Sequence, residues 1–269
     1  MIKSDFHVHS VYCDGTDTIN ELAEKAIELG MDALGYSSHA YMPPYFEMDY
    51  PIKSREAELE YIAEVNQAKA TYADKIDLFL GTECDYYSEM EKGKYDYVIG
   101  SVHHLIVGDQ TFAIDHSEKI MVDSVDKYYG GNYKNYVRDY YKLLSDVKNK
   151  TECDFVGHFD VVAKFNEGNK YFDESATWYL DYALECADAL LKQNALFEIN
   201  TGAIVRKLKA DPYPNKNIFD YIVRNGGRFV INSDCHFKNN LTFGYDIAMK
   251  YYENSDAIID FYDIVKNKK

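Results

Sequence analysis

Residues 2–10 read IKSDFHVHS, a short strand-like stretch that ends on two histidines. The pattern of apolar and polar residues in this stretch predicts a β-strand over Ile2 to Val8. Because neighbouring side chains on a strand point to opposite faces, His7 and His9 point to the same face. Two imidazoles on one face are well placed to bind a metal ion together.

Residues 228–236 read RFVINSDCH and have the same form near the other end of the chain. A strand is expected over Arg228 to Ile231, and Asp234 and His236 follow it. These two side chains share a face if the extended conformation persists beyond the strand. Two such pairs can hold two or more metal ions.

Between these two stretches the chain alternates strands with helices. The further strand candidates are Ala33 to Tyr36, Ile76 to Gly81, Tyr95 to Val102, Phe155 to Gly157 and Ala195 to Ile199. The helical segments are Thr18 to Leu29, Ser54 to Tyr72, a region that ends near Lys148, and Trp178 to Gln193. In the first helix, Thr18 and Glu21 form a capping box and Gly30 provides the stop.

Seven strand candidates that alternate with helices favour a mostly parallel sheet. The chain has 269 residues and no Pro- or Ser-rich linker. We therefore expect one α/β domain over residues 1–269, a distorted (β/α)7 barrel similar to a TIM barrel. No GxGxxG follows the first strand, which argues against an open, doubly wound dinucleotide-binding sheet.

Residue types that bind metals fall at the ends of the predicted strands. Besides the two pairs above they are His39, Glu83, His103, His104 and His158. The carboxyl ends of barrel strands meet at one mouth, so these residues become neighbours in space. Seven of the eight histidines belong to this set, and only His116 lies in a loop. Imidazole and carboxylate ligands suit zinc, manganese or iron, and the lack of a cysteine cluster argues against iron–sulfur or purely structural zinc.

The composition excludes several partners. With a net charge of −16, the protein as a whole repels nucleic acids and anionic membranes. No apolar stretch is long enough for a membrane span and the start has no signal-peptide core, so a cytoplasmic protein is expected. The tyrosine-rich stretch Tyr128 to Tyr141 is interpreted as an amphipathic helix, not a base-stacking surface. Cys13, Cys84 and Cys235 each neighbour a candidate ligand and are expected to face away from it.

The segments FHVHS, SSHA, GTECD, GSVHH, GHFD and NSDCH, in this order, resemble the PHP (polymerase and histidinol phosphatase) family over Phe6 to His236. EINTGAIVRKL, DPYPN and FVINSDCH resemble its histidinol-phosphatase branch most closely. The resemblance implies a distorted seven-stranded β/α barrel with three divalent metal ions. Two departures stand out: the family's S/T-D-H appears as Ser37-Ser38-His39, which lacks a supporting carboxylate, and a basic pair appears as Ala163-Lys164.

The resemblance also implies how the ligands divide. The first ion would be held by His7, His9, Glu83 and Asp234; the second by His103 and His158, with Glu83 bridging; and the third by Asp14, His39 and His236. His103 and His104 cannot both point inward on a regular strand, and His103 matches the family ligand. Six metal charges against three ligand carboxylates leave a net positive site, so an acidic protein can hold a phosphate there.

The expected mechanism is in-line attack on phosphorus by a hydroxide that bridges two metals. Arg206 would bind the phosphate oxygens, because its fork matches phosphate geometry, and Asp234 would accept or relay the proton. Lys164 is a second candidate for the phosphate. Asp160, or residues of the loop Tyr41 to Asp49, would accept hydrogen bonds from a cationic substrate.

Three functions stay open at this stage. The resemblance implies a phosphomonoesterase that acts on L-histidinol phosphate, a small molecule of histidine biosynthesis. Another phosphoesterase of the same family, acting on a nucleotide, a nucleic-acid 3′ end or phosphotyrosine, is the main alternative, although the acidic surface disfavours long nucleic acids. A non-catalytic metal-binding module is the third, and the intact ligand set argues against it.

Overall fold

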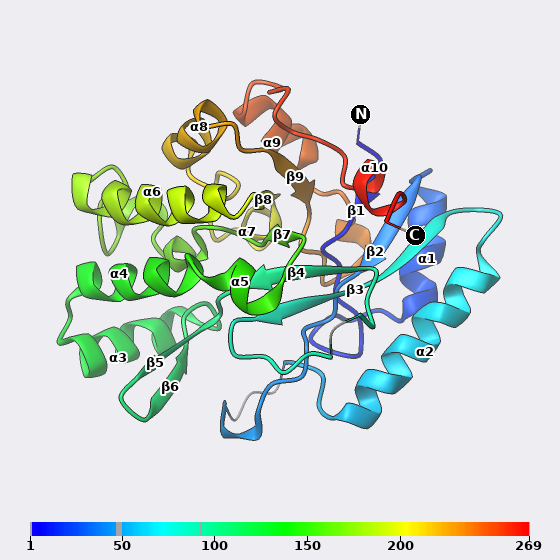
Figure 1. The fold of residues 1–269 in the computed structure, drawn as a ribbon, viewed down its shortest axis with the longest axis horizontal. Coiled ribbons are helices and arrows are strands. Elements are labelled where there is room, and N and C mark those ends of the chain that lie inside the picture. The colour runs from blue at the N-terminus through cyan, green and yellow to red at the C-terminus, as the bar shows by residue number, and fades with distance from the viewer. Residues whose placement is uncertain (1, 47–49, 92, 269) are drawn as a thin grey trace.

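Seven parallel strands form the centre of the molecule in the order β1-β2-β3-β4-β7-β8-β9 (Figure 1). The computed structural model describes residues 2–46, 50–91 and 93–268. The strands are β1 (Ser4–Asp5), β2 (Ala33–Tyr36), β3 (Asp77–Asp85), β4 (Tyr97–Ser101), β7 (Phe155–Val156), β8 (Leu196–Asn200) and β9 (Phe229–Asn232). This arrangement confirms the predicted distorted barrel of seven strands.

The sheet curls until its two edges meet. Beyond β1 and β9, the Cys235 N–H donates to the carbonyl of His7 at 2.9 Å, and the His9 N–H donates to the carbonyl of Cys235 at 2.8 Å. The Asn232 side chain accepts a bond from the Phe6 N–H at 2.8 Å. The barrel is therefore closed by the two segments that carry the HxH and DxH pairs, which brings the two ends of the sequence together.

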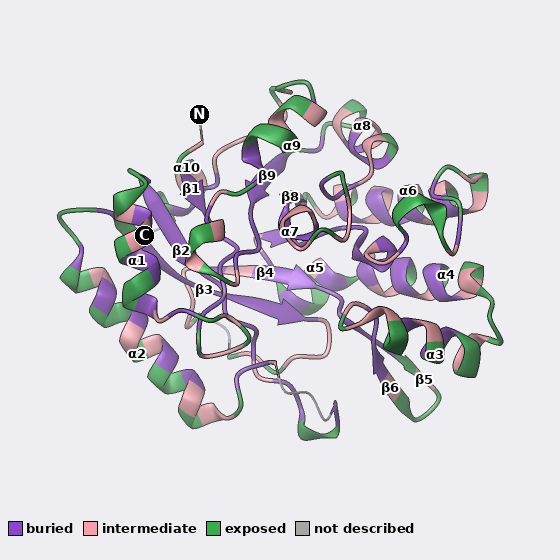
Figure 2. Ribbon diagram, turned by 180° about the vertical axis from the view of Figure 1, so that it is seen from behind, coloured by how far each residue is buried: buried purple, intermediate pink, exposed green. Residues whose placement is uncertain are grey.

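Helices cover the outside of the barrel. They are α1 (Ile19–Glu28), α2 (Arg55–Thr71), α3 (Glu118–Tyr129), α4 (Tyr133–Leu144), α5 (Val147–Thr151), α6 (Thr177–Lys192), α7 (Gly202–Val205), α8 (Lys216–Arg224), α9 (Tyr245–Tyr251) and α10 (Tyr262–Val265). Their inward faces are buried against the strands and their outer faces are exposed (Figure 2). No helix among the described residues is long and apolar enough to cross a membrane.

Aromatic side chains fill the barrel interior. The Tyr97 ring lies in the same buried cluster as Phe6 and Phe261, and its hydroxyl donates to the carbonyl oxygens of Phe6 and Tyr36 at 2.8 and 3.0 Å. A Cβ atom at Gly81 would lie 2.2 Å from the Tyr97 ring, so only glycine fits there. The packed interior leaves the carboxyl ends of the strands as the open end of the barrel.

The predicted elements agree closely with the structure in the first third of the chain. Strand β2 has the predicted bounds, and α1 has the predicted capping box of Thr18 and Glu21, with Gly30 beyond its end. Helix α2 is capped by Ser54, one residue before its first turn. Local signals fixed these elements because each cap is made by side chains close in sequence.

Three strand and helix predictions were wrong in detail. The first strand is only two residues long, with a separate bridge at Val8, because closure of the barrel bends the segment. Strand β3 continues to Asp85, so Glu83 lies within it. A left-handed Gly130 ends α3, and Asn132 caps α4, so the single helix expected over Tyr128 to Tyr141 is two helices. The hairpin of β5 (His104–Val107) and β6 (Gln110–Ala113) was not predicted.

Candidate metal centre and phosphate pocket

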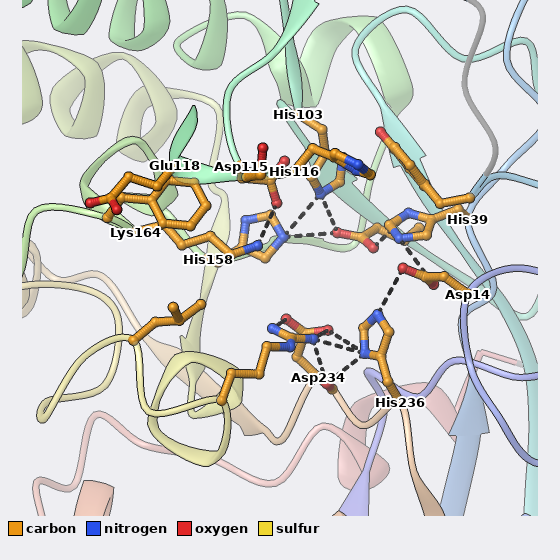
Figure 3. Close-up of a pocket in the computed structure, with 16 residues that line it drawn as sticks. Asp14, His39, His103, Asp115, His116, Glu118, His158, Lys164, Asp234 and His236 are labelled. Atoms are coloured by element: carbon orange, nitrogen blue, oxygen red, sulfur yellow. Dashed lines mark hydrogen bonds and ion pairs between the residues drawn. The ribbon is translucent and has the colours of Figure 1, made fainter. Parts of the chain in front are cut away.

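A cavity of about 650 Å³ opens at the carboxyl ends of the strands (Figure 3). Seven of the nine predicted metal ligands line this cavity, and with His7 and His9 they form four overlapping groups. These are His9, Asp14, His39 and His236; His7, Glu83 and His158; His7, His9 and Asp234; and His39, Glu83 and His103. Within each group the potential ligand atoms lie within 4.8 Å of one another, which is the spacing a shared metal ion requires.

Glu83 is at the centre of the cluster. Its Oε1 lies 3.0 Å from Nε2 of His158 and 3.2 Å from Nε2 of His103. Its Oε2 lies 3.0 Å from Nδ1 of His39 and 3.2 Å from Nε2 of His7. The two oxygens thus face different imidazoles, as a carboxylate that bridges two ions must do.

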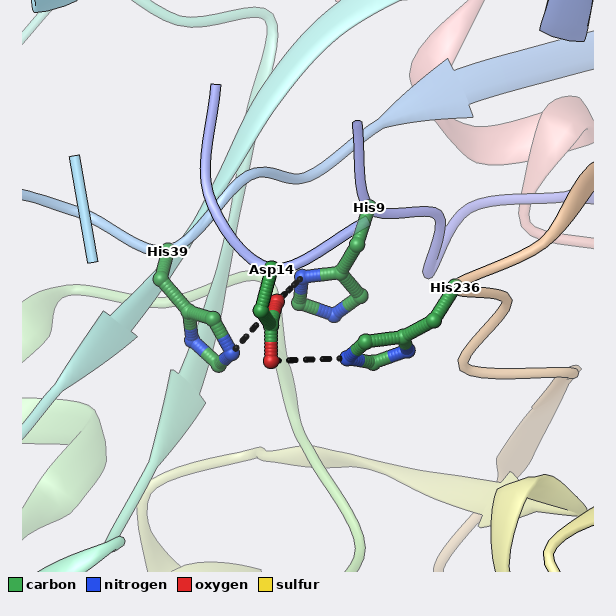
Figure 4. A group of neighbouring side chains, drawn as sticks. All are labelled: His9, Asp14, His39 and His236. Carbon is green, nitrogen blue, oxygen red and sulfur yellow. Dashed lines mark hydrogen bonds and ion pairs between the residues drawn. The ribbon is translucent and has the colours of Figure 1, made fainter. Parts of the chain in front are cut away.

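A second carboxylate, Asp14, joins the outer part of the cluster (Figure 4). Its Oδ2 lies 3.1 Å from Nε2 of His236, and its Oδ1 lies 3.5 Å from Nδ1 of His9 and 3.7 Å from Nε2 of His39. The Asp14 side chain is 35% exposed, whereas Glu83 is fully buried. This group includes the three residues expected for a third ion, and it adds His9.

Buried nitrogens without partners show that the cluster fits metal ions. Nε2 of His7 and Nε2 of His9 are buried and make no hydrogen bond, although carboxylates surround them. The other ring nitrogen of His7, Nδ1, is 2.7 Å from Oε1 of Glu198. A carboxylate that accepts a hydrogen bond from Nδ1–H favours the tautomer in which Nε2 carries a free lone pair. Imidazole binds a metal in this form.

Residues outside the ligand set hold the ligands in place. The Glu198 carboxylate also accepts the His158 N–H at 2.8 Å, and Asp85 accepts the His103 N–H at 2.7 Å. The Ser101 hydroxyl donates to Glu83 at 2.7 Å. Sequence reasoning missed these three positioning residues, and the only signal was the charge of Glu198 inside an apolar strand.

The structure shows what supports the first segment at one of the two departures from the family pattern, Ser37-Ser38-His39. Ser37 makes the first of these contacts. Its hydroxyl accepts the Val8 N–H at 2.8 Å and so braces the segment between His7 and His9. The Ser10 and Ser38 hydroxyls lie 2.9 Å apart in the same buried layer. Neutral hydroxyls therefore support this part of the first segment, and they take the place of the carboxylate that the family pattern has here.

His103, and not His104, joins the ligand groups. His104 is buried beside the cluster, with its ring stacked on Tyr50 at 5.9 Å and its Nδ1 3.4 Å from Asp85. Strand β4 ends at Ser101 and β5 begins at His104, so His103 lies in the short link between two strands. His104 lies outside all the ligand groups found in the described part of the chain.

Asp234 reaches the cluster by a route that the sequence did not predict. Strand β9 ends at Asn232, and Asp234 has a left-handed backbone with φ of 52°, so the extended conformation does not persist. Its Oδ1 still lies 3.4 Å from Nε2 of His9. Gly202 makes room for this turn, since a Cβ there would lie 2.8 Å from Asp234 Oδ2.

Arg206 lies over this carboxylate at the edge of the cavity. Its guanidinium donates to both Asp234 oxygens at 3.3 Å and to Nδ1 of His236 at 2.8 Å. Burial raises the pKa of Asp234, but the opposing effect of Arg206 and His7 is larger, and the net pKa is well below its usual range. Burial also opposes ionisation of Glu83, yet the imidazoles around it keep its pKa well below its usual range. Both carboxylates are therefore charged and ready to bind cations.

The other two predicted substrate residues lie apart from each other. Lys164 lines the main cavity and forms an ion pair with Asp115 at 3.1 Å. Asp160 instead lines a second cavity of about 280 Å³ together with Glu174 and Lys209. The turn of η2 (Val161–Ala163) separates Asp160 from Lys164 and sends the two side chains to different cavities. Of the loop Tyr41 to Asp49, residues 47–49 lie outside the described residues.

Two further residues of the main cavity were not singled out as site residues from the sequence. Asp115 and His116 follow the hairpin of β5 and β6 and line the cavity. Among the cysteines, Sγ of Cys13 lies 3.4 Å from Nδ1 of His9. Burial raises the pKa of the Cys13 thiol to about 12, which favours the protonated thiol beside His9.

Comparison with known proteins finds relatives that match nearly the whole chain. A probable histidinol-phosphatase from Deinococcus radiodurans is 29% identical over 91% of each chain. The histidinol-phosphatase of Bacillus subtilis is 25% identical over 93% of this chain and 99% of its own. Histidinol phosphate phosphatase from Lactococcus lactis, solved with zinc, L-histidinol and phosphate, superposes with a TM-score of 0.69 at 23% identity and covers 94% of this chain and 93% of its own.

A solved structure from Listeria monocytogenes, provisionally assigned as a histidinol phosphatase, has the same fold. Its TM-score is 0.80 at 20% identity, over 91% of this chain and 99% of the other. The family model of the PHP domain matches residues 5–202. This range includes seven of the nine clustered ligands, and Asp234 and His236 lie beyond it. The chain belongs to the PHP domain family.

Proposed function

We propose that this protein is a metal-dependent phosphomonoesterase and that its substrate is L-histidinol phosphate. The observation that carries the proposal is the group of ligands around Glu83, with unpaired nitrogens of His7 and His9 facing charged carboxylates. Membership of the PHP domain family supports a metal-dependent phosphatase. The names of the relatives from Deinococcus radiodurans and Bacillus subtilis support histidinol phosphate as the substrate.

The nine clustered residues would hold three divalent ions, and the chemistry suits zinc, manganese or iron. When bound, such ions supply positive charge for the phosphate oxygens and lower the pKa of a water molecule. The sixfold positive charge of three ions exceeds the threefold negative charge of Asp14, Glu83 and Asp234. The site then attracts a phosphate even though the net charge of the protein is −16.

The chain's own residues would bind and orient the ester. Arg206 lines the cavity with its guanidinium beside Asp234, so its N–H groups can turn to a phosphate oxygen. Lys164 lines the same cavity and supplies a second cation. Asp234, held beside Arg206 at the edge of the cavity, would take the proton from the attacking water. Its contact with Arg206 keeps that carboxylate in position.

A substrate panel tests the proposal. Protein reconstituted separately with zinc and with manganese is assayed for phosphate release from L-histidinol phosphate, AMP, phosphotyrosine and p-nitrophenyl phosphate. The proposal predicts the highest kcat/KM for L-histidinol phosphate. A higher value for AMP or phosphotyrosine would replace the substrate but keep the phosphatase activity, and a metal-loaded protein without activity on any ester would refute both.

A further inference from the structure

An ion pair lies inside the main cavity, beside the metal cluster. Lys164 Nζ and Asp115 Oδ2 are 3.1 Å apart, and both residues line the cavity with His103 and His158 (Figure 3). Their side chains are only 15% and 17% exposed. Asp115 comes from the segment after the β5–β6 hairpin and Lys164 from the end of η2, so two separate elements bring these opposite charges together.

Asp115 is charged in this position. Burial raises the pKa of its carboxyl, while Lys164 and His103 lower it, and the net pKa is about 2. Its partner Lys164 is a residue that the proposed function assigns to the phosphate. When Lys164 turns to a phosphate oxygen, the Asp115 carboxylate loses its cation and remains at the edge of the cavity without one.

The other carboxylates near this end of the cavity are engaged elsewhere. Glu118 accepts bonds from Lys170 at 2.7 Å and from the Tyr171 hydroxyl at 2.9 Å. Asp160, which the sequence suggested as an acceptor for a cationic substrate, lines the second cavity. Asp115 is therefore the carboxylate best placed to receive a cation that enters together with a phosphate.

We propose that Asp115 determines specificity by binding the ammonium group of the substrate, and that its pair with Lys164 selects phosphate esters of 2-amino alcohols. In such esters two carbons separate the ammonium from the ester oxygen. Lys164 and Asp115 lie next to each other, so they can pair with a phosphate and an ammonium that are also close together in one substrate. AMP has no ammonium, and in phosphotyrosine a ring separates the two charges. This inference rests on the proposed function and deepens it, because L-histidinol phosphate is a 2-amino alcohol ester.

The test compares esters that differ only in the amine. Reconstituted wild-type protein is assayed with L-histidinol phosphate and with 3-(imidazol-4-yl)propyl phosphate, and then with O-phosphoethanolamine and ethyl phosphate. The ratio of kcat/KM between the two members of a pair is measured for wild type, Asp115→Asn, Lys164→Gln and, as a matched control, Glu118→Gln. Differences in leaving-group reactivity cancel when the ratio of a variant is divided by that of wild type.

Asp115→Asn is expected to lower the preference for the amine-bearing ester by at least about tenfold, because a charge-assisted hydrogen bond is lost. Lys164→Gln should lower kcat/KM for both members of a pair without reducing their ratio, and Glu118→Gln should leave the ratio at its wild-type value. An Asp115→Asn ratio equal to wild type, or an equal loss in Glu118→Gln, would overturn the inference but leave the phosphatase proposal standing. Wild-type protein that hydrolyses none of the four esters would overturn both.

Discussion

Asp234 and Asp160 are both buried aspartates that follow a strand, yet the structure gives them opposite chemistry. Asp234 is 8% exposed and faces Arg206 and the imidazoles of the main cavity. Asp160 is 1% exposed and faces the second cavity, where its Oδ2 accepts the Asn215 N–H at 2.7 Å and its Oδ1 has no partner. Burial alone raises the pKa of each carboxyl, so the partners decide the outcome.

For Asp234 the partners outweigh burial, and its pKa is well below its usual range. For Asp160 burial outweighs the attraction of Lys209, the charge of Glu174 adds to the effect, and its pKa rises to about 7. Equal burial of a carboxylate therefore does not indicate a metal ligand. What marks the main cavity is the convergence of cationic and imidazole groups on each carboxylate.

The largest expected effect is that of Asp234→Asn. It removes the charge from a proposed ligand and proton acceptor, so we expect kcat to fall by at least about a thousandfold. Phosphate release from L-histidinol phosphate measures this, and circular dichroism checks the fold. Turnover above a tenth of the wild-type value would remove Asp234 from the mechanism.

Arg206→Ala removes the cation that contributes most to the low pKa of Asp234, in contrast to the raised pKa of Asp160. Loss of charge-assisted bonds to the phosphate should raise KM and lower kcat/KM by about 10- to 100-fold. Metal content, measured by plasma mass spectrometry, should stay at the wild-type level. Arg206→Lys keeps the charge without the fork and should lie in between. Wild-type kinetics in Arg206→Ala would eliminate its role.

Glu198→Gln tests how the ligands are positioned. The variant weakens the hold on Nδ1 of His7 and on the His158 N–H, so metal affinity should fall by about 10- to 100-fold. Competition with a chromogenic chelator measures the affinity. Glu174→Gln is the matched control, because it alters a buried glutamate of the second cavity and should leave the affinity unchanged. Equal losses in the two variants would indicate a general effect on stability.

Asp160→Asn is the counterpart of Asp234→Asn and should have the smallest effect. The unfolded chain releases the Asp160 proton near pH 4, whereas the folded chain holds it to about pH 7. The contribution to stability is thus fully present below pH 4 and is lost as the pH rises to 7. Relative to wild type, the variant should be more stable at pH 8 than at pH 5 by about 2 kcal/mol.

Denaturant unfolding of both proteins at the two pH values measures that difference, and subtracting wild type removes effects that both share. The kcat/KM of Asp160→Asn for L-histidinol phosphate should stay within about twofold of wild type, because a substitution outside the site has little effect on the transition state. A loss comparable with that of Arg206→Ala would make Asp160 a substrate residue, as the sequence first suggested.

The sequence predicts the site well wherever the topology alone decides the position. Parallel strands of a barrel end at the same mouth, so the ligands at the strand ends, from His7 to His236, could be brought together before any coordinates were known. Asp14 was assigned from the family resemblance. The two-residue period of a strand indicated that only one of His103 and His104 points inward, and the family resemblance selected His103.

The sequence predicts less where irregular backbone decides the position. The left-handed Asp234, the bend after β1 and the turn of η2 that separates Asp160 from Lys164 all depend on contacts between distant segments. Glu198 looks like an ordinary residue of an apolar strand, and its role emerges only when His7 is placed 2.7 Å from it. Asp115 follows a hairpin whose local turn signal, Gly108-Asp109 between two strand-like runs, was overlooked.

The central claim is that the clustered ligands bind metal ions that activity requires. The most direct measurement is phosphate release from L-histidinol phosphate by protein stripped of metal with a chelator and then titrated with zinc or manganese. The account predicts no activity in the stripped protein and recovery that saturates at more than one ion per chain. Full activity without metal, or saturation by a single ion, would contradict it.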